Sequence, residues 1–126
     1  MACVSSLRRP CMQWPRLRIG TRPSKLARVQ VNMVRQALCR FIPDLEDKIE
    51  IVVFETPGDQ DRSLCLEELG GRGVFTDTLD ASVASGEIDC VVHAMKDMAP
   101  ALPRALKIGA TLEREDPREV LVSPHF

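Results

Sequence analysis

The sequence contains 126 residues, the length of one domain, and a chain of this length typically buries about two-thirds of the surface that its unfolded form exposes. Its composition, 44% hydrophobic and 28% charged, is that of an ordinary globular domain. No stretch approaches the roughly 20 consecutive apolar residues of a membrane-spanning helix, and only 4% of the residues are aromatic. We therefore expect neither a membrane protein nor a protein that binds nucleic acid by stacking its bases.

The net charge of −1 conceals a strong asymmetry along the chain. Residues 1–43 carry a charge of +9 with no acidic residue, and residues 44–126 carry −10. Two interpretations of the basic end stay open: an Arg-rich targeting segment, or a site that binds anionic groups. We assign residues 1–15 to a leader that is targeting, disordered or structural. The protein is expected in the cytoplasm, with organellar import as the alternative.

Cysteine and histidine patterns give no sign of a disulfide framework or a metal site. The five cysteines form no C-x-x-C pair and their number is odd, which favours a reducing compartment. The two histidines, His93 and His125, have no partner at the spacing of metal ligands.

The first predicted elements are a strand, a helix and a second strand. Leu17–Gly20 is expected to form a short strand, and Ser24 is a plausible N-cap for a helix that runs to Pro43. The helix should bury apolar residues that recur every three or four positions: Leu26, Val29, Met33, Ala37 and Phe41. The β-branched run Ile49–Phe54 predicts the second strand.

The remaining elements complete an alternating pattern. Thr76 should cap a second helix that stops at Gly86, because glycine readily takes the left-handed conformation of a helix end. Further strands are predicted at Ile88–His93, Lys107–Leu112 and Val120–Ser123. This order predicts an α/β fold with a mostly parallel sheet flanked by helices.

Three polar segments follow predicted strands and should meet at one edge of that sheet: residues 21–24, 56–59 and 93–97. At the first, Arg22 and Ser24 precede the helix, where a guanidinium beside helix N-terminal amides suits a carboxylate or phosphate. At the third, Asp97 with neighbouring Lys96 could stabilise a developing cation or handle a proton. The plainer alternatives are a solvated Arg, a simple N-cap Ser and a Lys–Asp loop pair. From these residues alone we favour the plainer alternatives, and the residue types indicate no more than an anion-binding α/β domain.

Five segments resemble, in order, the motifs of the porphobilinogen deaminase (hydroxymethylbilane synthase) family. Residues 18–30, RIGTRPSKLARVQ, are similar to its R-[IV]-[GA]-T-R-x-S-x-L-A-x-x-Q opening, and TPGD at 56–59 resembles its T-x-G-D turn. GGRGVF at 70–75 resembles its glycine-rich stretch, DCVVHAMKD at 89–97 its D-x-[VA]-V-H-[SA]-x-K-D motif, and EREDPR at 113–118 its E-R-x-D-P-R segment. Each motif is weak alone, and the ordered set is specific.

The resemblance implies a function and roles for individual residues. The family condenses four porphobilinogen units with loss of ammonia, on a dipyrromethane cofactor, in tetrapyrrole (heme) biosynthesis. Asp97 matches the catalytic aspartate that binds pyrrole N–H groups. Arg22, Ser24 and Lys96 match residues that bind cofactor or substrate carboxylates, and Asp59 and Phe75 match further active-site positions. Partners would be porphobilinogen and the growing oligopyrrole.

The resemblance also implies an architecture of which this chain supplies one part. The family's first two domains resemble a type II periplasmic-binding-protein fold, so residues 16–112 would be lobe one and 113–126 the crossover toward a second domain. Lobe one would then lack a strand that the family returns to it later in the chain. None of the five cysteines has a context that matches the cofactor-attachment site, and we expect that cysteine and the second-domain arginines to belong to parts of the family architecture outside these 126 residues.

Some positions depart from the family pattern. Glu68 and Asp77-Thr78 stand where Lys and Lys-Glu are usual, and Ala99 replaces the usual proline after the Lys-Asp pair. Whether this chain is an enzyme by itself therefore stays open. The alternatives are a non-catalytic lobe that binds an anion or pyrrole, or a decayed homologue.

Overall fold

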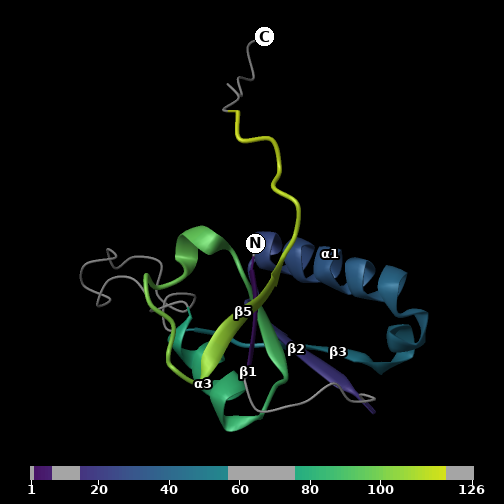
Figure 1. The fold of residues 1–126 in the computed structure, drawn as a ribbon, viewed down its shortest axis with the longest axis horizontal. Helices are drawn as coiled ribbons and strands as arrows, with labels where there is room; N and C mark the ends of the chain where they lie inside the picture. The colour runs from purple at the N-terminus through teal and green to yellow at the C-terminus, as the bar shows by residue number, and fades with distance from the viewer. Residues whose placement is uncertain (1, 7–14, 57–75, 119–126) are drawn as a thin grey trace.

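The computed structural model describes residues 2–6, 15–56 and 76–118, and it has a five-stranded sheet with helices on both faces (Figure 1). The strand order is β3-β2-β4-β1-β5. Strands β2 (Leu17–Thr21), β3 (Ile49–Val53) and β4 (Cys90–His93) are parallel. Strand β1 (Ala2–Ser6) pairs antiparallel with both β4 and β5 (Leu106–Thr111). The predicted α/β fold with a mostly parallel sheet is confirmed.

The side chains of the sheet alternate between two cores, one under each helix. Ile19, Cys90 and Val92 face the core to which helix α1 (Lys25–Phe41) contributes Val31 and Val34. Val91, between Cys90 and Val92, faces the other core, beneath helix α3 (Asp77–Ser85). This alternation is the two-residue period of a strand buried on both faces.

Helix α1 forms where it was predicted, but it buries a different face. Leu26, Val29 and Phe41 are 51%, 57% and 86% exposed, so the predicted buried face is wrong. The residues that contact the sheet are Ala27, Val31, Val34 and, partly, Leu38. The predicted and the observed buried residues both have helical spacing. The direction in which the chain leaves β2 decides which set faces the sheet, and periodicity alone does not give that direction.

Helix α3 matches its prediction closely. Thr76 stands at the N-cap position, but its side chain makes no capping hydrogen bond, and Gly86 ends the helix with a φ of 81°. Only glycine adopts this left-handed conformation without strain from a Cβ atom, which explains the stop.

Other segments add to or differ from the prediction. Two short 3-10 helices, η1 (Pro43–Lys48) and η2 (Met95–Asp97), follow α1 and β4. Ala2–Ser6, which we assigned to the leader, form β1 inside the sheet. Residues 112–118 leave the body of the domain (Figure 1), and the predicted strand Val120–Ser123 lies outside the described residues.

No helix in the described ranges is long and apolar enough to cross a membrane.

Candidate anion-binding site at the ends of β2 and β4

The centre of the candidate site is an ion pair between two of the predicted residues. Arg22 directly follows β2, and Asp97 lies in η2 just beyond β4. Arg22 Nη1 is 3.5 Å from Asp97 Oδ2, and the two side chains are 17% and 28% exposed. The parallel pairing of β2 with β4 brings both segments to one edge of the sheet, as predicted. Partial burial strengthens such a pair relative to one in bulk water.

Ser24 caps helix α1. Its Oγ accepts a hydrogen bond from the Ala27 backbone N–H at 3.2 Å, and its extended backbone is that of an N-cap residue. Its carbonyl accepts from the Arg28 N–H at 3.0 Å. Ser24 therefore has a structural role at the edge of the site, and a role in ligand binding stays a prediction.

The other predicted site residues are placed less directly. Lys96 is exposed in η2, beside Asp97. Asp59 and Phe75 lie outside the described residues, and so does the glycine-rich segment 70–73.

A buried pair, which the sequence analysis missed, holds the end of β4 near the site. His93 Nε2 lies 3.2 Å from Asp80 Oδ1, and the two side chains are 2% and 7% exposed. Asp80 belongs to α3, so the contact ties that helix to the last residue of β4. An aspartate beside Leu79, on the buried side of a helix, was the signal that could have identified it. His93 is accordingly a satisfied core residue that positions the turn carrying Asp97.

A second pair fixes the opposite end of the same strands. Arg18 Nε and Nη2 donate to Asp89 Oδ2 and Oδ1, both at 3.2 Å, and the Arg18 backbone N–H donates to Oδ2 at 2.9 Å. The hydrogen bond to Asp89 is the main cause of a raised pKa for the Arg18 guanidinium. Asp89 is buried, so this forked pair locks β2 beside β4 far from the site.

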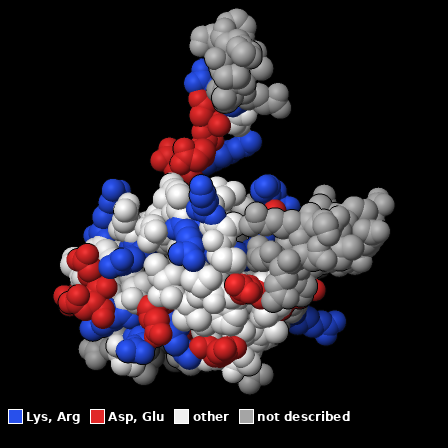
Figure 2. Space-filling model, turned by 180° about the vertical axis from the view of Figure 1, so that it is seen from behind, with Lys and Arg blue, Asp and Glu red and all other residues white. Residues whose placement is uncertain are grey.

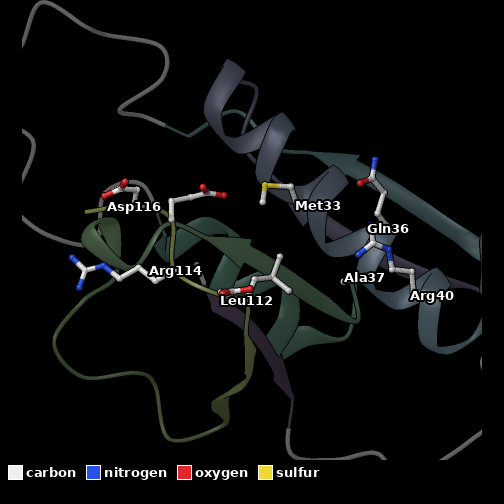
Figure 3. A pocket seen from close by; sticks show the side chains of 9 residues that line it. Met33, Gln36, Ala37, Arg40, Leu112, Arg114 and Asp116 are labelled. Carbon is white, nitrogen blue, oxygen red and sulfur yellow. The ribbon is translucent and has the colours of Figure 1, made fainter. Parts of the chain in front are cut away.

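The surface around the ion pair is a narrow cleft. Arg22, Ser24, His93, Ala94 and Asp97 are among the residues lining a volume of about 20 Å³, enough for about one water molecule. A larger hollow of about 450 Å³ lies between α1 and the segment after β5 (Figure 3). Met33, Gln36 and Arg40 line it from the helix, and Arg114 and Asp116 from the segment. The narrow cleft is the candidate site, because a partly buried cation and carboxylate converge there at the strand ends.

The charge asymmetry of the sequence does not divide the face seen in Figure 2 into a basic and an acidic half. Basic and acidic side chains are interspersed over the face seen in Figure 2, and residues 113–118 carry both signs above it. No group of three side chains suited to hold a metal ion occurs in the part of the chain that the structure describes.

Comparison with known proteins decides the family. Residues 17–126 match the family model described as porphobilinogen deaminase, dipyromethane cofactor binding domain. The chain belongs to the porphobilinogen deaminase family. It is 47% identical over 107 residues to the porphobilinogen deaminase of Syntrophomonas wolfei and 44% identical over 108 residues to that of Moorella thermoacetica. These matches cover 85% and 86% of the chain and 34% of each relative, so the chain spans about a third of the length of the curated relatives it matches. The predicted identity as the N-terminal domain of this family is confirmed.

The donor set at the site fits the family's cofactor. A dipyrromethane presents carboxylate side chains and pyrrole N–H groups, which need cations and a hydrogen-bond acceptor. Arg22 in the cleft and Lys96, exposed on the adjoining turn, would supply the cations, and Asp97 would supply the acceptor. Cys39 lies on α1 and Cys90 is buried in β4, so neither of these two cysteines stands in this cleft.

Proposed function

We propose that this chain supplies the catalytic carboxylate and part of the carboxylate-binding surface of a porphobilinogen deaminase (hydroxymethylbilane synthase). The reaction would be the stepwise condensation of four porphobilinogen units with loss of ammonia. The supporting observation is the contact between Arg22 and Asp97, which joins two separate sequence motifs at the carboxyl ends of β2 and β4.

Asp97 would act on the pyrrole nitrogen. Loss of ammonia from porphobilinogen, and attack by the free α-carbon of a second pyrrole, both place positive charge on pyrrole nitrogen. A carboxylate that accepts the N–H hydrogen bond stabilises that charge more in the transition state than in the neutral ground state. The position of Asp97 is preorganised, because its N–H donates to the Ala94 carbonyl at 3.0 Å and neighbouring Met98 is anchored in the core.

Arg22 would hold an acetate or propionate side chain of the substrate. Its guanidinium has a fork of donors, so it can bind a ligand carboxylate while it remains near Asp97. Lys96, exposed on the same turn, adds a second cation without fixed geometry. The cofactor, when bound, provides the pyrrole to which the first substrate unit is joined.

Calorimetric titration with porphobilinogen tests this assignment. We expect Arg22→Ala to weaken binding at least about tenfold, since a charge-assisted hydrogen bond to a carboxylate is lost. Arg40→Ala, an exposed position near the end of α1, removes the same charge and should leave the affinity unchanged. Equal affinities of wild type and Arg22→Ala would refute the assignment.

Binding of a carboxylated pyrrole without turnover is the second candidate, and the observation that favours it is the Arg22–Asp97 pair, a cation beside a hydrogen-bond acceptor. Under this alternative the chain binds a carboxylated pyrrole but gives no uroporphyrin fluorescence on incubation with porphobilinogen. We expect that result for the chain alone, and no dipyrromethane adduct on its cysteines by mass spectrometry. Product formation or an adduct would show that the chain is a complete enzyme.

A further inference from the structure

The position of β1 in the sheet is unusual. It lies between β4 and β5 and is antiparallel to both, whereas the other four strands run in one direction. Within the described sheet, β5 has β1 as its sole neighbouring strand. The connection of β5 to the rest of the sheet therefore passes through five residues near the start of the chain.

The backbone contributes most to this connection. In β5, Leu106 is buried and residues 107–111 are exposed. Few side-chain contacts thus hold β5, and its N–H and C=O groups depend on the ladder with β1. Backbone polar groups that lose such partners must find water or another strand.

Strand β1 lies outside the part of the chain that matches the family model, whereas the strands that it pairs with lie inside that part. The match begins at residue 17, so β2, β3, β4 and β5 lie inside it and β1 lies outside. Neighbouring strands are about 4.8 Å apart, so β4 and β5 stand about two such spacings from one another and cannot pair. The matched domain alone therefore has a gap the width of one strand.

We propose that the gap between β4 and β5 is a strand-acceptor site, filled in this chain by its own residues Ala2–Ser6 and able to take the same segment as a separate peptide. The ligand class is a short extended peptide that pairs antiparallel with β4 and β5. Its affinity comes from main-chain hydrogen bonds on two sides, as in other cases of strand addition.

Deletion of residues 1–9 tests the site by amide hydrogen exchange. We expect exchange in β5 and β4 to become at least about tenfold faster, with α1 amides such as Val31 and Val34 slowed as before. A synthetic peptide of residues 1–9 should then restore the protection of β4 and β5. A scrambled peptide of the same composition should not.

A modified peptide separates backbone pairing from other kinds of binding. Ser5 is in register with Cys90 on β4 and Lys107 on β5, away from the irregularity between Cys3 and Val4. Methylation of the Ser5 backbone nitrogen removes one ladder donor and keeps the side chain. Binding should weaken about tenfold, the equivalent of one net hydrogen bond.

A second route keeps the test decisive if the shortened chain does not fold. A protease site placed within residues 8–13 of the full chain is cleaved after folding, and isotope-labelled peptide is added in excess. Native mass spectrometry should show the labelled peptide replacing the original segment. Protection of β5 that does not depend on residues 1–9, or failure of the peptide to bind in both experiments, would overturn the proposal.

Discussion

Asp97 lies 3.5 Å from the guanidinium of Arg22, so each is the other's partner and also a group that a pyrrole carboxylic acid would engage. A ligand carboxylate must share Arg22 with Asp97, whereas a pyrrole N–H gains an acceptor from the same carboxylate. Under the proposed function, the pair would therefore favour ligands that present both groups.

Asp97→Asn should change the affinities for two ligands in opposite directions. Succinate, which has carboxylates alone, should bind roughly threefold more tightly, because the competing negative charge beside Arg22 is gone. Porphobilinogen should bind several-fold more weakly, because the charged acceptor for its pyrrole N–H is lost. Calorimetric titration measures both. Asp44→Asn, an exposed change of the same charge in η1, should affect neither, and a shift of both affinities in one direction would contradict this account.

The pair Arg18–Asp89 should matter for stability rather than for binding. Asp89→Asn keeps the size of the side chain but removes the charge that Arg18 engages, and the side chain of Asp89 is 2% exposed. We expect a loss of about 2 kcal/mol in the free energy of unfolding, measured by urea denaturation. Glu50→Gln removes the charge of a 44% exposed partner of Arg16 and should cost less than about 0.5 kcal/mol. Equal losses would show that burial of the pair is unimportant.

The order of the elements was predictable from the sequence, because turn and cap residues and strand composition act locally. Thr76 and Gly86 bound α3 as expected, and the strands from β2 to β5 lie within a residue or two of their predicted positions. The face of α1 was not predictable, since Leu26 and Val31 both belong to helically spaced apolar sets and tertiary packing chose between them.

Part of the site was predictable from the parallel order of the strands. Parallel strands bring their carboxyl ends together, and this placed Arg22 beside Asp97. The buried partner of His93 was missed because the pair joins two elements whose packing no local pattern records. Strand β1 was missed because its partners are distant along the chain and its pairing is antiparallel within a parallel sheet. The compartment stays a prediction.

Protonation of Asp116 should weaken its hydrogen bonds with Arg118. Hydrogen bonds from the Arg118 side chain, and then from its backbone N–H, lower the pKa of Asp116 below its ordinary 3.8. Because these hydrogen bonds lower the pKa of Asp116, the stabilisation that they give is present at higher pH and is lost as the pH falls through the lowered value. An NMR titration of the Asp116 carboxyl carbon should show the low midpoint, and Arg118→Gln should move it up toward 3.8. An unchanged midpoint in the variant would exclude Arg118 as the cause.

Because Gly20 packs closely against Ile88, the stability losses caused by substitutions at these two positions should not be additive. A Cβ atom added at Gly20, the fourth residue of β2, would lie 2.4 Å from Ile88 Cδ1, which is closer than real contacts allow. We expect Gly20→Ala to cost about 1–3 kcal/mol of stability, because the buried Ile88 must leave its rotamer or shift the strand.

The double variant gives the decisive measurement. Ile88→Val removes the Cδ1 atom and should alone cost about 1 kcal/mol, the usual loss for one buried methyl group. In the double variant the new Cβ occupies the space that Cδ1 has left, so the combined loss should be smaller than the sum of the two by about 1 kcal/mol or more. Urea denaturation of all four proteins completes the cycle. Ile88→Val combined with Val34→Ala, a buried position in the separate core beneath α1, is the control and should be additive. Additive losses for Gly20→Ala and Ile88→Val would mean that the strain at Gly20 is relieved by movement of the backbone rather than of Ile88.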